Sequence, residues 1–309
     1  MSYALTVAAF GLLYAMLALG LNLQMGYTGI VNFGYVAFVA IGAYTSAILT
    51  TSYGWSCPLA WAVATLLSAA ASYPLGVLTI RLGGDYLAVV TLGFSQLIVL
   101  FILNERGLTK GSVGISGIAR PFAQLGYGAA QALTLLIIVL AVFASAWMMW
   151  RLAHSPLGRL LRAIQANEAA AQALGKNTTG YKILVLVIGS GIAGFAGALY
   201  ASWVQYISPE QFSPDVTFNT FIALILGGVG SILGPIIGAF VLIVFLQGTI
   251  VLPDYLPMIS ATQIAAMRFM LIGLLLIVLV LFRPNGLMGT IAMRRKKAEM
   301  ARKAEAPTT

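Results

Sequence analysis

The chain has 309 residues, of which 60% are hydrophobic and 8% are charged, and its formal net charge is +9. Its mean hydropathy of +0.96 excludes a water-soluble globular protein. Apolar runs of about 17–25 residues recur from end to end, and each is long enough to cross a hydrocarbon core of about 30 Å. Backbone groups in lipid must be satisfied internally, so such runs form helices or a closed barrel. Because the runs are continuous rather than alternating, we predict an all-α, polytopic membrane helix bundle.

The apolar runs predict about nine spans, and their boundaries also allow eight or ten. The nine lie roughly at 4–24, 27–50, 58–80, 85–103, 128–150, 181–203, 216–233, 234–252 and 262–282. The first run has no basic n-region and no evident small-residue cleavage site, so we expect a first span rather than a secretory signal. The runs predict one membrane domain over residues 1–289, followed by a basic tail over residues 290–309.

A polar segment, residues 151–182, interrupts the apolar runs. It holds five of the 17 Lys and Arg residues, the single His and one of the eight acids. Four apolar residues within it follow the i, i+3, i+4, i+7 spacing of one helix face, namely Leu157, Leu160, Leu161 and Ile164. Asn167 can cap a second short helix that has Glu168 in its first turn and ends at Gly175. We therefore predict two short helices held at a membrane surface.

The distribution of basic residues predicts the orientation in the membrane. With the 151–182 segment in the cytoplasm, that side also receives Arg81, Arg283 and the six Lys and Arg residues of the tail. The outer side then receives only Arg106, Lys110 and Arg120. This asymmetry places the N-terminus outside and the tail inside, near anionic lipid. The positive charge is thus explained without nucleic acid as a partner.

A glycine-rich stretch with polar side chains joins the first two predicted spans. Its candidate pathway residues are Asn22, Tyr27, Thr28 and Asn32. Buried carboxamides are costly in lipid unless they are hydrogen-bonded, so these residues either join neighbouring helices or line a pathway for a substrate. A similar spacing of glycines recurs at 227–238, which allows two related halves around a central pathway. Glycine-rich spans resemble one another easily, so the repeat remains one of two interpretations.

Two segments on the predicted outer side are longer than a tight hairpin requires. Residues 104–127 are rich in Gly, Ser and Pro, and residues 204–215 contain two Ser-Pro turns and two acids. Such loops on a compact bundle are either a docking surface or simple connectors.

Single residues give little sign of chemistry. Cys57 has no second cysteine with which to pair, and we expect His154 at the membrane interface rather than as a proton carrier. Arg268 falls inside the last predicted span, where it either extends its side chain to the outer surface, pairs, or has a function. No G-x-x-x-x-G-K-[ST] motif, catalytic set or metal-ligand cluster is found in the sequence. The chain is therefore not expected to be an enzyme or to bind a metal or cofactor.

Four stretches and a closing motif carry a family resemblance. They are Gly20-Leu21-Asn22 through Gly26-Tyr27-Thr28-Gly29, Leu108-Thr109-Lys110-Gly111 through Gly117-Ile118, Ser155-Pro156-Leu157-Gly158-Arg159 through Asn167-Glu168-Ala169-Ala170, Leu226-Gly227-Gly228 through Gly234-Pro235, and Arg283-Pro284-Asn285-Gly286-Leu287. From about Gly20 to Gly289, the chain resembles the membrane permease of high-affinity branched-chain amino acid ABC importers. It resembles the subunit type that pairs with a second, similar permease.

The resemblance implies a heteromeric importer in a bacterial inner membrane. Its partners are a second permease, two cytoplasmic ATPases that carry ATP and Mg²⁺, a periplasmic substrate-binding protein and membrane lipid. The resemblance further implies that residues of the 151–182 segment press into a cleft on the ATPase, namely Asn167, Glu168, Ala169, Ala170 and Gly175. It implies an outer docking loop that includes Thr109, Gly111 and Gly114.

Other transport classes compete with this interpretation. A permease for urea or a short amide shares the glycine-rich architecture. An ion-driven secondary transporter would favour paired acids inside the membrane, and no predicted span has one at its centre. A membrane enzyme would need converging catalytic residues, which the sequence does not supply.

Overall fold

The computed structural model of the chain describes residues 3–79 and 84–255, together with 270, 271, 273, 274, 277, 281 and 286–288. Its long or apolar helices are α1 (Tyr3–Thr28), α2 (Tyr35–Thr51), α3 (Cys57–Thr79), α4 (Gly84–Asn104), α6 (Tyr127–His154), α9 (Thr178–Val204), α10 (Pro214–Gly227) and α11 (Leu233–Tyr255). Its short elements are α5 (Arg106–Thr109), α7 (Pro156–Ala166), α8 (Glu168–Ala173), the 3₁₀ helices η2 (Gly111–Val113), η3 (Ala123–Leu125) and η4 (Pro209–Phe212), and the strands β1 (Ile115–Ser116) and β2 (Tyr206–Ile207).

The helices agree with a polytopic membrane bundle. Five of them, in α1, α3, α4, α6 and α9, are long and apolar enough to cross a membrane, and three shorter apolar helices accompany them. Eight of the nine predicted spans coincide with apolar helices, and the ninth, 262–282, lies almost entirely outside the described residues. The span count of about nine therefore stays a prediction.

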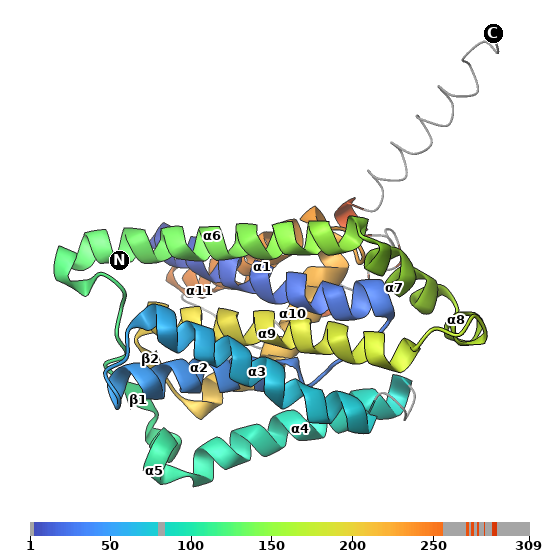
Figure 1. The fold of residues 1–309 in the computed structure, drawn as a ribbon. Coiled ribbons are helices and arrows are strands. Elements are labelled where there is room, and N and C mark those ends of the chain that lie inside the picture. Colours follow the sequence, from blue (N-terminus) through green and yellow to red (C-terminus); the bar gives the residue numbers. More distant parts are fainter. Residues whose placement is uncertain are drawn as a thin grey trace.

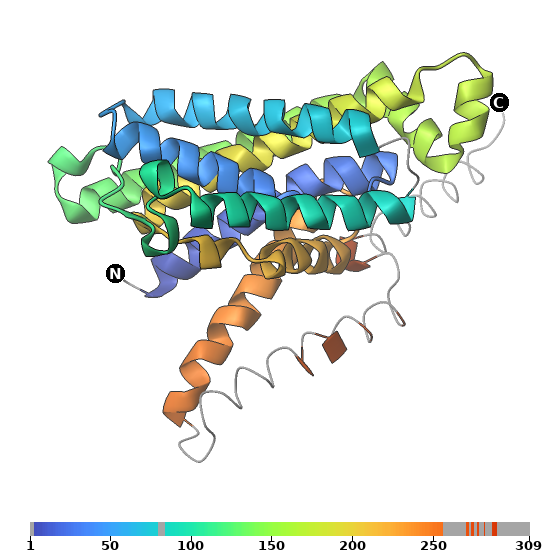
Figure 2. The same ribbon diagram turned by 90° about the horizontal axis from the view of Figure 1, so that it is seen from below.

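Helix α9 lies at the centre of the bundle, between α1, α2 and α3 (Figure 1). Small residues allow α9 and α2 to approach closely: a Cβ atom at Gly42 would lie 2.0 Å from the Gly194 carbonyl oxygen. Without a hydrophobic driving force between helices in lipid, such close backbone packing is a main source of helix association. Seen from below, α11 leaves the side of the bundle at an angle (Figure 2).

The first two helices differ from the predicted spans. Helix α1 continues through Thr28, and α2 begins only at Tyr35, so a non-helical segment separates the two helices. Threonines on neighbouring helices bind backbone amides of this segment and of the first turn of α2: the Phe33 amide donates to Thr91 Oγ1 at 3.1 Å, and the Val36 amide donates to Thr217 Oγ1 at 3.0 Å. Irregular backbone of this kind is tolerated at membrane depth because protein surrounds it.

The two ends of the bundle carry different short elements (Figure 1). Helices α7 and α8 lie at one end, which we call the α8 end. At the opposite end, which we call the β end, β1 pairs antiparallel with β2, with Ile115 opposite Ile207. This strand pair is a small exception to the all-α prediction, and it joins the two loops 104–127 and 204–215.

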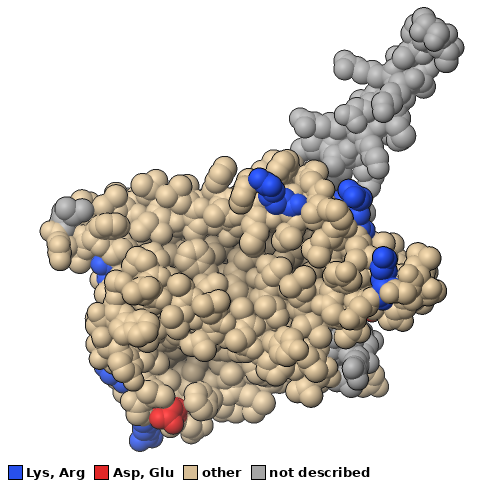
Figure 3. Space-filling view, viewed as in Figure 1, with Lys and Arg blue, Asp and Glu red and all other residues tan. Residues whose placement is uncertain are grey.

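Basic residues lie at the two ends of the bundle. Figure 3 shows Lys and Arg side chains toward both ends, with uncharged surface over most of the face between them. The α8 end holds Arg151, Arg159, Arg162, Lys176 and Lys182, whereas Arg106, Lys110 and Arg120 belong to the loop at the β end.

Candidate functional site

The site begins with α7, whose start is fixed by its sequence. Ser155 caps the helix, with its Oγ accepting from the Gly158 amide at 3.2 Å, and Pro156 follows in the first turn. Leu161 and Ile164 are buried and Leu157 and Leu160 are half-buried, so the predicted apolar face is confirmed. This face anchors a polar helix on the end of the bundle.

Helix α8 has the boundaries that the sequence predicts. Asn167 Oδ1 accepts from the Ala170 amide at 3.0 Å, which confirms the cap. Gly175 has a positive φ of 75°, and its amide donates to the Gln172 carbonyl at 2.8 Å while the Lys176 amide donates to the Ala171 carbonyl at 3.2 Å. These are the two bonds of a Schellman motif, which require a residue that tolerates the left-handed conformation. The predicted stop at Gly175 is confirmed.

Two side-chain contacts fix α8 on the start of α9. Lys182 Nζ lies 2.5 Å from Glu168 Oε2, and Gln172 Nε2 donates to Thr178 Oγ1 at 2.9 Å. The Glu168 carboxylate, which the sequence suggested as a partner contact, is thus paired within the chain. By contrast, Leu174 is 79% exposed beside it.

Helix α7 is also tied to the neighbouring spans. Arg162 donates to the Ala153 carbonyl at 3.0 Å, near the end of α6. Gln165 Nε2 donates to the Met25 carbonyl of α1 at 3.4 Å. The α7–α8 pair is therefore connected to α6, α1 and α9. His154, at the end of α6, lies beside Trp150, with ring centroids 4.9 Å apart and ring planes tilted by 40°.

The candidate pathway residues are buried and hydrogen-bonded inside the chain. Asn22 Nδ2 donates to the Ser231 carbonyl at 2.6 Å, and Asn22 Oδ1 accepts from the Gly230 amide at 2.8 Å. Asn32 Nδ2 donates to Gln24 Oε1 at 3.1 Å. The two glycine-rich stretches that the sequence aligned thus contact each other.

Polar residues of this stretch form further hydrogen bonds within the chain. Gln24, a polar residue of the same stretch that is not one of the candidate pathway residues, also donates to the Leu186 carbonyl of α9 at 3.2 Å, and Thr28 donates to the Gln24 carbonyl at 2.6 Å. Tyr27 donates to the Gly230 carbonyl at 3.3 Å. The bonds of Asn22, Gln24 and Tyr27 thus reach other parts of the bundle, whereas those of Thr28 and Asn32 stay within the α1–α2 region.

Tyr27 also lines an open groove at the α8 end, of about 750 Å³. The groove includes Trp150, His154, Arg162 and Ser231. A role in a substrate pathway stays a prediction for Tyr27 and for the three buried polar residues alike.

The predicted docking residues shape the loop at the β end. Thr109 Oγ1 donates to the Ile102 carbonyl at 2.6 Å and also to the Glu105 carbonyl, and the Gly111 amide donates to Thr109 Oγ1 at 3.3 Å. Gly114 has a φ of 75°, and a Cβ atom there would lie 2.2 Å from the Ile207 carbonyl oxygen. These three residues thus hold the loop in shape, whereas Val113 is 75% exposed between them.

Sequence reasoning missed Arg120 as an anchor of this loop. Its side chain is buried, Nη2 donates to the Trp203 carbonyl at 2.8 Å, and the guanidinium lies 5.3 Å from the Tyr127 ring centre. It thereby caps carbonyl groups at the end of α9. Cys57 is buried nearby, with Sγ 3.6 Å from the Ala119 carbonyl. In the sequence, the contact of Arg120 with the end of α9 is indicated only by the presence of an arginine in a loop, which is a weak signal. Arg268 lies outside the described residues.

No metal cluster is formed in the part of the chain that the structure describes: no three His, Cys, Asp or Glu side chains gather there.

Apolar helices long enough to span a membrane, close small-residue packing and a polar helix pair at one end are typical of a multi-pass membrane protein. The chain belongs to the family described as the permease component of branched-chain amino acid transport systems, whose model matches residues 3–280.

Curated relatives agree with this family. The chain is 33% identical to the high-affinity branched-chain amino acid transport permease LivM of Salmonella typhimurium, over 91% of this chain and 69% of that protein. It is 32% identical to LivM of Escherichia coli, over 97% and 73%. The LivH permease of Escherichia coli is 26% identical, over 75% and 80%. No solved structure matches the chain.

Proposed function

We propose that this chain is a permease subunit of an ATP-driven importer for branched-chain amino acids in a bacterial inner membrane. It would pair with a second, similar permease and bind two cytoplasmic ATPases and a periplasmic substrate-binding protein. Family membership supports the transport role, and the relatives named LivM and LivH support a pair of permeases. ATP and Mg²⁺ belong to the partner subunits, and this chain forms part of the pathway.

The observation that carries the coupling role is the attachment of α7–α8 to the bundle. Helix α8 is paired with α9 through Glu168 and Lys182, while α7 is bonded to α6 and α1. A polar element held this firmly can pass a movement of bound ATPases into the spans. Its exposed residues, Ala169, Ala170 and Leu174, are the proposed contact surface. Asn167, Glu168 and Gly175 give that surface its shape.

The charge distribution supports the proposed orientation. Five of the basic residues belong to the segment at the α8 end, and the positive-inside rule supports a cytoplasmic location for that end and the tail. The loops at the β end then face the periplasm, where Val113, Phe122 and Tyr206 are exposed for a binding protein.

Uptake into proteoliposomes tests the proposal. The chain, expressed with its genomic neighbours, is expected to extract together with an ATPase and to import leucine only with ATP and a binding protein. Extraction without any ATPase would remove the importer assignment. Uptake driven by an ion gradient without ATP would favour the secondary transporter, and uptake of urea or a short amide instead of leucine would favour that permease class.

A further inference from the structure

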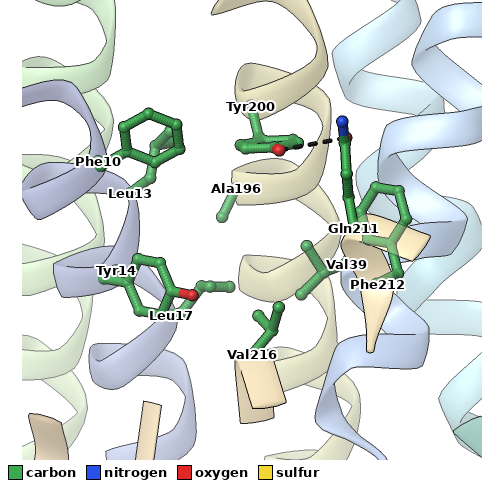
Figure 4. A pocket seen from close by; sticks show the side chains of 10 residues that line it. All are labelled: Phe10, Leu13, Tyr14, Leu17, Val39, Ala196, Tyr200, Gln211, Phe212 and Val216. Atoms are coloured by element: carbon green, nitrogen blue, oxygen red, sulfur yellow. Dashed lines mark hydrogen bonds between the residues drawn. The ribbon is translucent and has the colours of Figure 1, made fainter. Parts of the chain in front are cut away.

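A cavity of about 110 Å³ lies between α1, α2, α9 and the η4–α10 segment (Figure 4). Apolar side chains form most of its wall, among them Leu13 and Leu17 of α1, Val39 of α2, Ala196 of α9 and Val216 of α10. We propose that this cavity is a subsite for the aliphatic side chain of the transported amino acid, of up to four carbons and branched. This inference rests on the proposed function.

The cavity lies in the half of the bundle nearer the β end. It is lined by the first half of α1 and the last part of α9, both of which are next to that end. The loop after β2 folds back into the bundle, and Phe212 is buried there, with its ring 5.8 Å from the Tyr44 ring and 6.2 Å from the Tyr200 ring. The sequence suggested only an outer loop at 204–215, and this fold-back forms one side of the cavity.

Its size fits a branched aliphatic group. An apolar cavity of about 150 Å³ stays dry and binds benzene. A volume near 110 Å³ therefore suits a smaller group, such as the side chain of valine, leucine or isoleucine, and disfavours an indole. Burial of each methylene contributes about 0.8 kcal/mol, so a close fit discriminates between side chains.

Polar groups stand at the edge of the apolar wall. The Tyr200 hydroxyl donates to Gln211 Oε1 at 3.2 Å, as Figure 4 shows, and the hydroxyl of Tyr14 belongs to the same lining. Few, fixed polar groups beside an apolar pocket are typical of sites for small molecules. They give a site for the polar end of an amino acid while its side chain enters the cavity.

Two carboxylates suit the ammonium group of such a substrate. Glu210 precedes Gln211 on η4, and Asp215 lies in the first turn of α10, next to Val216. Both are exposed, and neither forms an ion pair with a side chain that the structure describes. A cationic group approaching from the β end therefore meets negative charge beside the cavity.

Filling the cavity tests the subsite. Ala196→Leu in the assembled importer is expected to lower leucine and isoleucine uptake by about 10-fold or more, the usual effect of one to a few methylenes in an apolar pocket. Alanine uptake is expected to fall less. The matched control is Ala70→Leu, at an exposed position of α3. Val216→Ala, which enlarges the cavity, is expected to raise phenylalanine uptake relative to leucine.

The outcomes separate this inference from the proposed function. If the unaltered importer shows no ATP-driven uptake, the proposed function fails. If it transports leucine, and neither Ala196→Leu nor Val216→Ala changes the ratios among alanine, leucine and phenylalanine, the cavity is a packing void and the subsite is wrong. Should Ala196→Leu fail to assemble with the ATPase, the ratio of phenylalanine to leucine uptake measured for Val216→Ala decides whether the cavity is a subsite.

Discussion

Glu168 and Lys182 form an ion pair with 2.5 Å between Oε2 and Nζ, and this pair joins the first turn of α8 to the first turns of α9. The Lys182 side chain is 16% exposed and that of Glu168 is 38% exposed. Helix α9 then runs to Tyr200, which lines the cavity near the β end, roughly 27 Å away at 1.5 Å per residue. One helix thus connects the proposed ATPase contact with the proposed substrate subsite.

Reversal of one charge in this pair tests whether Glu168 acts by positioning α8. Glu168→Lys places two ammonium groups together, so ATP-driven uptake is expected to fall several-fold while the chain still inserts. The exchange of both charges, Glu168→Lys with Lys182→Glu, is expected to restore most of the uptake. Failure of the double variant to recover would assign Glu168 to direct contact with a partner instead.

Gly175 provides a test of the end of α8. Its φ of 75° is costly for a residue with a Cβ atom, and nothing lies within 4 Å of where that atom would be. Gly175→Ala is therefore expected to cost about 1–2 kcal/mol through conformation alone. Gly175→Pro cannot adopt this φ and is expected to uncouple ATP hydrolysis from uptake. Gly175→Asn is the control, since asparagine tolerates this conformation, and its uptake should stay close to normal. Normal coupling in the proline variant would contradict the role of the turn.

Gly114 and Gly117 form a matched pair at the β end. Both have positive φ, of 75° and 74°, but a Cβ atom at Gly114 would lie 2.2 Å from the Ile207 carbonyl oxygen, whereas nothing lies within 4 Å at Gly117. Gly114→Ala is expected to separate β1 from β2 and to abolish stimulation of the ATPase by the binding protein, with basal hydrolysis retained. Gly117→Ala should reduce the stimulation only slightly. Equal stimulation in the two variants would show that the strand pair is not needed for docking.

Substitution of Asn22 distinguishes the two interpretations of the buried polar residues, which either join neighbouring helices or line a pathway for a substrate. Asn22→Ala removes bonds to the Ser231 carbonyl and the Gly230 amide, which leaves two partly buried backbone groups without these partners. Unfolding free energy is expected to fall by about 1–3 kcal/mol, seen as a lower Tm in detergent. An unchanged Tm with altered substrate preference would instead assign Asn22 to the pathway.

Local signals in the sequence were enough to predict the apolar face of α7 and the two ends of α8. The leucine spacing, the Asn167 cap and the Gly175 stop each depend on neighbours within one or two turns, and each is confirmed. The break between α1 and α2 was misplaced because its bonds come from Thr91 and Thr217, far away in the chain. The strand pair likewise depends on a contact between two loops about 90 residues apart, and the fold-back around Phe212 depends on packing against Tyr44 of α2, which is also distant in the chain.

A cross-link from Leu174 tests the coupling claim most directly. Leu174 is 79% exposed at the end of α8, and Val113 is 75% exposed at the β end, so each can be replaced by cysteine in a Cys57→Ser background. We expect Leu174→Cys to cross-link to the co-expressed ATPase in inside-out vesicles and Val113→Cys not to do so. A Leu174→Cys variant that reacts only with reagents added from the periplasmic side, or that cross-links to the binding protein, would contradict this expectation.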